Sequence, residues 1–285
     1  MVKEEIARPS LIKWNRVAIY VCFILFTLIV LVPVYWMARS SLANASDLTK
    51  LPLIYFPTPT LRNFQTLVSQ IPINQYVRNS LLFAVSTTFV SLLVSFLAAY
   101  AFARIQFPGS GVILWILLLS MALPDVGTIV PLYRILKDLH LLDKISGLTL
   151  VLSSTLTPFT VWVLISFIKQ VPYEIEEAAI IDGASLPQIF LRILLPVTMP
   201  GLVTMGLINF INAWNNLLYP LSFSTSPSSK TLSVAITEVF AGFSPYGKPW
   251  ELIMAVGLAM TIPVVFLVLL SQRAIVRGLT GGAIK

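Results

Sequence analysis

The stretch Glu177–Pro200, EAAIIDGASLPQIFLRILLPVTMP, is the most polar part of an otherwise apolar chain and lies between two long hydrophobic segments. Pro172, shortly before it, suits the first residue of a short helix, because the N–H that proline lacks would be unpaired there. Gly183 can adopt the left-handed geometry that ends a helix. Ser185 and Gln188 form a capping-box pattern that begins another. The stretch therefore predicts a helix, a glycine turn and a second helix.

Three glutamates, Glu174, Glu176 and Glu177, fall in or near the first turns of the predicted helix. The positive end of the helix dipole favours carboxylates at that place. A segment that lies flat in the membrane interface is the simpler alternative, but it needs neither three acids nor a central glycine. We therefore expect a compact and rather rigid protrusion.

The spacing of the whole stretch resembles the cytoplasmic EAA loop of the membrane subunits of ABC importers. The resemblance implies a coupling helix that docks into a groove on a separate ATPase subunit. There the carboxylates of Glu177 and Asp182 can meet cationic side chains or backbone N–H groups, while Asp182 also caps its own turn and Gly183 serves the backbone geometry. The positions assigned to ATPase coupling are Glu177, Ala178, Ala179, Asp182, Gly183, Ala184, Phe190 and Pro196, and the pattern also includes Ile193, Leu195 and Pro200.

The composition places the chain among integral membrane proteins. Hydrophobic residues make up 57% of its 285 residues and charged residues only 11%, whereas soluble domains carry roughly 25% charged residues. In a membrane protein the net charge of +7 is first a topology signal, and we expect no nucleic-acid partner. Cys22 is the only cysteine, which predicts neither an intrachain disulfide nor a cysteine cluster for a metal.

Six apolar segments have about the 20 residues that a helix needs to cross the hydrocarbon core. We predict an all-α integral membrane protein with six transmembrane helices and a helix–turn–helix loop between the fourth and fifth. The third should be bent or broken between Pro124 and Pro131, and small residues every four positions in the second, at Ser91, Ser95 and Ala99, should let another helix approach closely. Within a single domain 1–285, the spans are 17–38, 80–103, 112–133, 145–168, 201–221 and 252–270, with a coupling loop 172–195 and a tail 272–285.

The segments between the spans are polar. Residues 39–79 are rich in proline, so they cannot form one continuous helix. Residues 222–250 form a second polar loop, with a short helix expected over 234–240. Six spans place both termini on one side, and four basic residues within the first 16 place that side in the cytoplasm. The first span has no cleavage pattern and is expected to stay as an anchor.

Polar side chains gather along the fifth span. Asn209, Asn212 and Asn216 lie at i, i+3 and i+7 and so share a helix face. Amides and aromatic rings suit a neutral, hydroxyl-rich solute, whereas the alternative is hydrogen bonding between helices. We predict that the following residues line a translocation pathway: Asn209, Asn212, Trp214, Asn215, Asn216 and Tyr219.

Two further titratable residues stand out. Asp125 is an ionisable group near the end of an apolar span, which by default suggests function. Pro124 and Gly127 indicate a broken helix at the outer edge, so a gate or helix-cap role competes with contact to a solute. His140 stands in an outer loop where importer subunits usually have glycine between two leucines. One isolated histidine does not make a metal site.

The chain contains a decoy nucleotide motif. Residues 242–248, GFSPYGK, fit the phosphate-loop spacing up to the lysine. The next residue is Pro249, where Ser or Thr should meet the magnesium ion. We therefore expect no enzyme activity in this chain, and any ATP hydrolysis would belong to a separate subunit.

The tail Gln272–Lys285, QRAIVRGLTGGAIK, resembles the ends of sugar-type importer subunits. The resemblance implies that the tail reaches along the ATPase dimer interface through Arg277, Gly278, Gly281 and Gly282. The alternative is a simple basic anchor at the inner membrane surface.

The resemblance covers nearly the whole chain and points to maltose-type permease subunits of carbohydrate ABC importers. It implies a homologous second permease in a heterodimer, two ATP-binding cassette ATPases and an extracytoplasmic sugar-binding protein, in the inner (plasma) membrane of a prokaryotic cell. It implies no cofactor on this chain, with ATP and magnesium held by the ATPases. In maltose-type importers the partner permease holds most of the sugar, so this chain would line the path.

Two other classes stay open at this point. One is an ATP-independent channel or secondary transporter for a neutral solute. Such a transporter is expected to carry membrane-buried charges or inverted repeats, and Asp125 is the one such charge in the sequence. The other is a structural membrane scaffold, which the polar face of the fifth span disfavours.

Overall fold

The computed structural model describes residues 11–242 and 248–281, and every regular element in these ranges is a helix. The chain divides into two compact units. One comprises residues 1–67 and 243–258, and the other comprises 68–242 and 259–285. The predicted all-α class is confirmed.

The first unit begins with α1 (Leu11–Ser41), which includes the first predicted span. Its apolar stretch contains no buried residue, so lipid or a partner protein must surround it. The predicted polar loop contains two short helices, α2 (Ala45–Thr49) and α3 (Arg62–Gln70). The buried Asn63 donates from Nδ2 to the carbonyls of Ser41 and Ala43, both at 2.8 Å, and so closes this loop.

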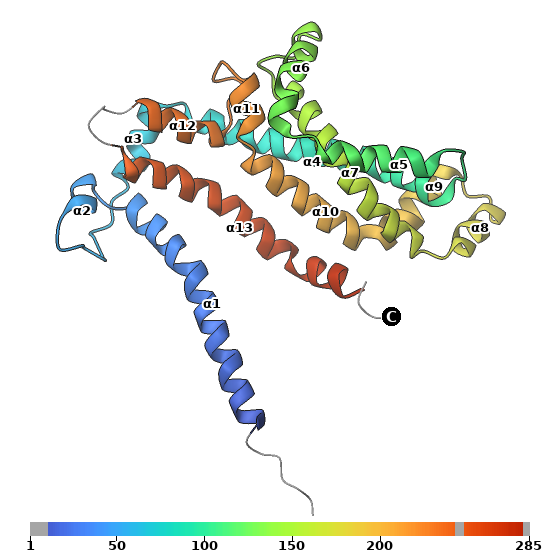
Figure 1. Ribbon diagram of the computed structural model, residues 1–285, viewed down its shortest axis with the longest axis horizontal. Helices are drawn as coiled ribbons and strands as arrows, with labels where there is room; N and C mark the ends of the chain where they lie inside the picture. Colours follow the sequence, from blue (N-terminus) through green and yellow to red (C-terminus); the bar gives the residue numbers. More distant parts are fainter. Residues whose placement is uncertain (1–10, 243–247, 282–285) are drawn as a thin grey trace, which may run out of the picture. The chain divides into compact units, whose positions relative to one another are not determined.

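The core of the second unit lies between three long helices that pack against one another, α4 (Ile73–Arg104), α7 (Ile145–Lys169) and α10 (Leu195–Asn215) (Figure 1). In lipid, helices associate through close packing and hydrogen bonds, because the acyl chains are as apolar as leucine. The small residues predicted to allow this approach are all buried: Ser91, Ser95 and Ala99.

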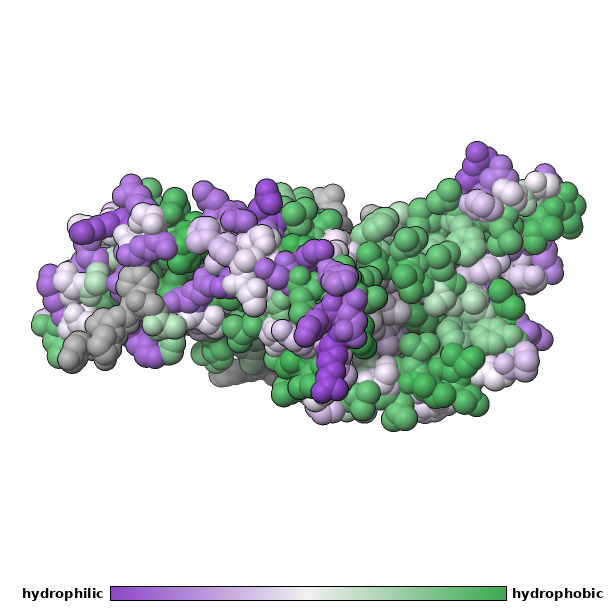
Figure 2. Space-filling model, turned by 90° about the horizontal axis from the view of Figure 1, so that it is seen from above, coloured by the Kyte–Doolittle hydropathy of each residue, from purple (hydrophilic) through white to green (hydrophobic). Residues whose placement is uncertain are grey.

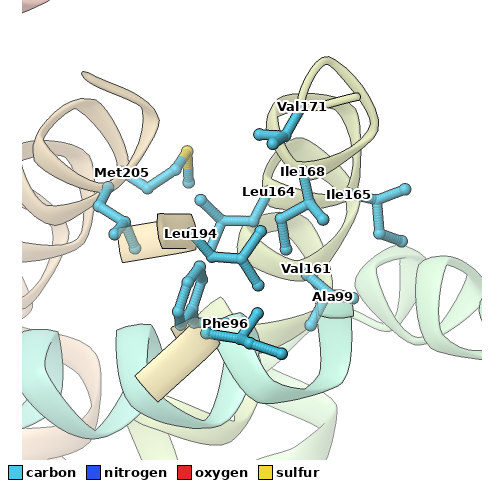
Figure 3. Packing of buried hydrophobic residues seen from close by; sticks show 11 residues of the cluster. Phe96, Ala99, Val161, Leu164, Ile165, Ile168, Val171, Leu194 and Met205 are labelled. Carbon is cyan, nitrogen blue, oxygen red and sulfur yellow. The ribbon is translucent and has the colours of Figure 1, made fainter. Parts of the chain in front are cut away.

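Apolar side chains from these helices interlock in the part of the core that Figure 3 shows. Phe96 and Ala99 from α4 face Leu164 and Ile168 from α7, and Leu194 lies among them. All five are buried, at 7% exposure or less. This packing fixes the helix ends from which the predicted coupling loop departs.

The third predicted span is broken, as its prolines suggested. It consists of α5 (Ser110–Leu119), a 3₁₀ turn (Ser120–Ala122) and α6 (Asp125–Asp138). The two parts are bent by 104°, and Figure 1 shows α6 turning away from α5. Pro124 lies at the break and has the extended backbone that begins α6. The predicted bend is therefore confirmed, and the predicted range 112–133 includes parts of both α5 and α6.

Several helices begin or end at residues other than the predicted ones. α4 begins before residue 80 because Tyr76 and Asn79 are buried and bonded to other elements. The fifth span lies in a continuous helical run from Leu186 to Asn215, of which α10 is the last part, and the short α11 (Leu218–Phe223) follows. The helix predicted over 234–240 is α12 (Leu232–Gly242). The last helix, α13 (Trp250–Gly281), continues beyond the predicted end at residue 270.

Within the described part of the chain, five helices are long and apolar enough to cross a membrane, or six if the bent pair is counted as one span. This agrees with the six predicted spans. Figure 2 shows hydrophobic side chains over most of the right-hand part of the visible surface, and hydrophilic side chains gathered over the central part, where α6 stands in Figure 1. The chain is a multi-pass membrane protein.

The corner between α6 and α7 is tight. His140 has φ 55° and Asp143 has φ 57°, a left-handed geometry that glycine adopts without cost. This backbone geometry explains why importer subunits usually have glycine at the position of His140.

Gly147 closes this corner, because a Cβ there would lie 2.2 Å from the carbonyl oxygen of Leu141. We expect Gly147→Ala to lower the free energy of unfolding by about 1–3 kcal/mol through overpacking. Thermal unfolding of the detergent-purified chain measures this. Gly111→Ala is the matched control, since nothing lies within 4 Å of a Cβ at that position, and equal melting temperatures for the two variants would contradict the expectation.

Candidate functional site

The predicted coupling loop forms a helical elbow, residues 172–195, at one end of the long helices (Figure 1). Pro172 precedes α8 (Tyr173–Ile181) as its N-cap residue, one position earlier than predicted. Gly183 has φ +82°. Its N–H donates to the Ile180 carbonyl at 3.0 Å, and the Ala184 N–H donates to the Ala179 carbonyl at 2.9 Å. This pair of bonds is a Schellman cap, so the predicted glycine turn is present.

The second arm of the elbow is α9 (Leu186–Ile189), which continues through the π-helical turn η2 (Phe190–Leu194) into α10. Gln188 reaches back so that its Oε1 accepts the Ser185 backbone N–H at 2.7 Å, as the capping-box pattern predicted. The Phe190 ring lies 5.6 Å from Phe96 and 4.5 Å from Tyr100, centroid to centroid. The predicted coupling residue Phe190 therefore anchors the elbow to α4.

A buried ion pair fixes the first arm. Arg104, at the end of α4, donates from Nε to Glu176 Oε1 at 2.7 Å. Its guanidinium also donates to the carbonyls of Ile168 and Val171, at 3.0 and 2.7 Å, and lies 5.6 Å from the Tyr173 ring centroid. The side chain of Glu176 is 1% exposed. One arginine thus joins α4, the end of α7 and the first turn of α8.

Sequence reasoning missed this ion pair. It grouped Glu176 with its neighbours as a dipole-compensating acid and assigned no partner to Arg104. The available signal was helical phase, because Glu176 and Ala179 lie at i and i+3 on the inward face of α8 while Glu174 and Glu177 are exposed. Only the fold brings Arg104 to that face.

Some of the remaining residues assigned to coupling pack against the core, and the others are exposed on the surface. Ala179 and Ala184 pack against the buried core. Glu177, Ala178, Asp182, Gly183 and Pro196 are exposed. Ile180 and Ile181 are exposed beside them, at 54% and 85%. The exposed side of the elbow thus combines carboxylates with uncovered apolar side chains, a composition suited to a protein partner.

The predicted pathway residues do not share one environment. Asn209 is buried, at 1% exposure. Its Nδ2 donates to Ser91 Oγ at 2.6 Å and to Thr160 Oγ1 at 3.1 Å. It therefore links α10 to α4 and α7, which is the hydrogen bonding between helices that stood as the alternative to a pathway role.

The two aromatic residues of the set are also buried. Trp214 donates from Nε1 to the Met260 carbonyl at 2.9 Å and stacks on Phe210, with ring centroids 5.9 Å apart. Tyr219 stacks on Phe223 at the same centroid distance. Each is 1% exposed, so these rings support the fold and are not open to a solute. Asn215 is exposed at the end of α10.

The other two asparagines reach a polar cavity of about 410 Å³ among the 3₁₀ turn, α6, α7 and α10. Asn212 and Asn216 line it together with Asp125, whose Oδ1 accepts a hydrogen bond from the Tyr219 hydroxyl at 3.0 Å. The sequence placed Asp125 apart from the asparagine face. The 104° break brings them to one site.

The predicted tail contacts fall mostly at the edge of the described structure. α13 extends through Arg277, Gly278 and Gly281. Gly282 lies outside the described residues.

Asp143 organises the loop that follows α11. Its N–H donates to the Phe223 carbonyl at 3.0 Å, and its Oδ1 accepts from the N–H groups of Thr225 and Ser226, at 2.9 and 3.0 Å, and from the Ser229 hydroxyl. Burial alone would raise the pKa of Asp143, but the hydrogen bonds from Ser226, Ser229 and Thr225 outweigh it and hold the pKa well below its ordinary range.

Asp143→Asn is therefore expected to lower the free energy of unfolding at pH 7 by about 1–2 kcal/mol. A lowered folded-state pKa adds stability above the unfolded value of about 3.9 and loses it as the pH falls. The difference between wild type and variant should thus shrink below about pH 4. Melting temperatures measured from pH 7 to pH 3 test this, and a pH-independent difference would contradict it.

The fold and these sites define a class: a multi-pass helical membrane protein with a broken span and a surface elbow. Residues 91–281 match the family described as "Binding-protein-dependent transport system inner membrane component". The chain belongs to this family.

Curated relatives match along nearly their whole length. The chain is 35% identical over 265 residues to the trehalose transport system permease protein SugB of Mycobacterium tuberculosis, covering 92% of this chain and 96% of that protein. It is 34% identical over 256 residues to the sulfoquinovosyl glycerol transport system permease protein SmoH of Agrobacterium fabrum, covering 90% and 89%.

A solved structure shares the fold. It is a bacterial ABC transporter involved in the import of the acidic polysaccharide alginate, with a TM-score of 0.80 at 18% identity, covering 94% of this chain and 98% of that one.

Proposed function

We propose that this chain is the membrane-spanning permease subunit of an ATP-driven, binding-protein-dependent importer for a sugar. It forms half of the translocation pathway, and its elbow couples that pathway to a separate ATPase subunit. The names of its relatives support a sugar as the class of solute. Both termini and the elbow lie in the cytoplasm.

The observation that carries this proposal is the build of the elbow. Arg104 and Phe190 fix it to α4, so a force on its surface moves the long helices as a body. Its outer side keeps Glu177, Asp182 and the isoleucines uncovered. An ATPase subunit can bind the exposed apolar side chains of the elbow. Because the elbow is packed rigidly against the long helices, a movement of the bound ATPase is transmitted to those helices.

The assembly that follows contains this chain, a homologous second permease, two ATP-binding cassette ATPases and an extracytoplasmic sugar-binding protein. ATP and magnesium are bound by the ATPases. Closure of the ATPases moves the elbow, and the helices then expose the path to one side of the membrane at a time. The cycle is ordered because each partner binds the two states with different affinity.

Purification of the tagged chain from its own cells tests the proposal. We expect an ATPase to co-purify, and solute uptake into liposomes to require ATP. Glu177→Lys should release the ATPase without unfolding the chain, because Glu177 is exposed. Glu174→Lys, an exposed acid one turn earlier, is the control for charge alone. A chain that purifies without an ATPase and moves solute without ATP would be a channel or a secondary transporter instead.

A further inference from the structure

The polar cavity beside the broken span is lined by several side chains that can form hydrogen bonds. Its polar residues come from the 3₁₀ turn, α6, α7 and the end of α10. They are Ser120, Asp125, Thr128, Ser154, Thr155, Asn212 and Asn216.

The serine and threonine hydroxyls of this lining donate their hydrogens to backbone carbonyls. Ser120, Thr128, Ser154 and Thr155 each donate to the backbone carbonyl three residues earlier, at 2.6–2.9 Å. Each of these hydroxyls keeps its oxygen as an acceptor, because a hydroxyl has one hydrogen and two acceptor sites, and Thr128 and Thr155 also interact with the Tyr219 hydroxyl.

The amide and the carboxylate extend this pattern. Asn212 donates from Nδ2 to the Ile208 carbonyl of its own helix at 2.9 Å, which leaves Oδ1 as an acceptor and the second Nδ2 hydrogen as a donor. Asp125 accepts from Tyr219 on Oδ1, and no lysine or arginine in the described part of the chain forms an ion pair with it. The Oδ1 of Asn216 accepts the Tyr219 N–H at 3.1 Å, so both hydrogens of its amide group remain donors.

We propose that this cavity is a solute-contacting section of the path on this subunit, and that it selects hydroxyl-rich uncharged sugars against anionic ones. An acceptor-rich wall pairs with the many O–H donors of a sugar. The Asp125 carboxylate repels a carboxylate or sulfonate that carries no hydrogen to donate. The inference rests on the proposed function, since it names the solute class for that pathway.

The test uses charged thiol reagents of similar size, so it does not require the natural solute. In a Cys22→Ser background, Asn212→Cys places a thiol on the cavity wall. That side chain bonds only within its own helix, so the substitution keeps the fold. Rates of modification by a cationic and an anionic methanethiosulfonate are measured on the solubilised full-length complex.

We expect Asp125→Asn to lower the cation-to-anion rate ratio about tenfold, as expected for the loss of one nearby charge in a partly hydrated cavity. Asn keeps an oxygen acceptor for the Tyr219 hydroxyl, and Asp125→Glu should preserve the ratio. The comparison is made at one thiol, so the reagents' intrinsic reactivities cancel. In addition, a neutral disaccharide that is imported should slow modification of Asn212→Cys.

A ratio unchanged by Asp125→Asn, or a thiol that neither reagent reaches, would overturn the inference and leave Asp125 as an anchor for Tyr219. An ATPase that still co-purifies would show that the proposed function survives. Loss of the ATPase with the charge effect intact would reject the proposed function instead.

Discussion

Arg104→Met is expected to lower the free energy of unfolding by about 3–5 kcal/mol, because removing one partner leaves a buried charge unpaired. Glu176 is 1% exposed and has Arg104 as its ion-pair partner. The carbonyls of Ile168 and Val171 would lose their donors as well. The substitution thus frees the first arm of the elbow from both α4 and α7.

The neighbouring acid supplies the control. Glu176→Gln keeps an oxygen acceptor and should cost less than Arg104→Met, while Glu177→Gln changes an exposed side chain and should leave stability within about 0.5 kcal/mol. Thermal unfolding in detergent, followed by tryptophan fluorescence, measures all three. Equal melting temperatures for Arg104→Met and Glu177→Gln would show that the ion pair does not fix the elbow.

Gly183→Val is expected to weaken ATPase docking at least tenfold with little effect on the membrane core. Gly183 has φ +82°, where an L-residue costs about 1–2 kcal/mol and a β-branched residue more. The chain can relieve this strain by opening the Schellman cap, which turns the second arm away from the first. A mismatch of about 1.4 kcal/mol corresponds to a tenfold loss in affinity.

Gly109 offers a matched control, because it has the same φ of +82° and, like Gly183, has no atom within 4 Å of the place that a Cβ would occupy. Gly109→Val should strain a different turn to a similar extent and leave docking intact. Titration of membranes that carry each variant with purified ATPase subunits gives the two affinities. Equal weakening by both substitutions would assign the effect to general strain rather than to the elbow.

The sequence was most informative where local rules operate. The turn at Gly183 follows from the backbone geometry that glycine allows, and the capping box follows from the spacing of Ser185 and Gln188. The helix break near residue 124 follows from the hydrogen bonds that the prolines remove. The six membrane spans could be predicted from the length and composition of the apolar segments alone. These predictions are confirmed, apart from the ends of several helices.

What the sequence could not distinguish depends on neighbours distant in the chain. Asn209, Asn212 and Asn216 share a helical spacing, but Ser91 and Thr160 lie against the first of them and a cavity against the other two. Helical phase alone cannot distinguish a buried asparagine from an exposed one. The pairing of Arg104 with Glu176 likewise requires knowing that α4 ends where α8 begins.

The central claim is that the elbow faces the cytoplasm and is covered there by an ATPase. Ile181 is 85% exposed at its tip, so Ile181→Cys in a Cys22→Ser background gives a direct reporter. An impermeant thiol reagent should label this cysteine in inside-out membrane vesicles and not in right-side-out ones, and added ATPase subunits should protect it. Labelling from the outer face, or labelling from the inner face that the ATPase does not slow, would contradict the account.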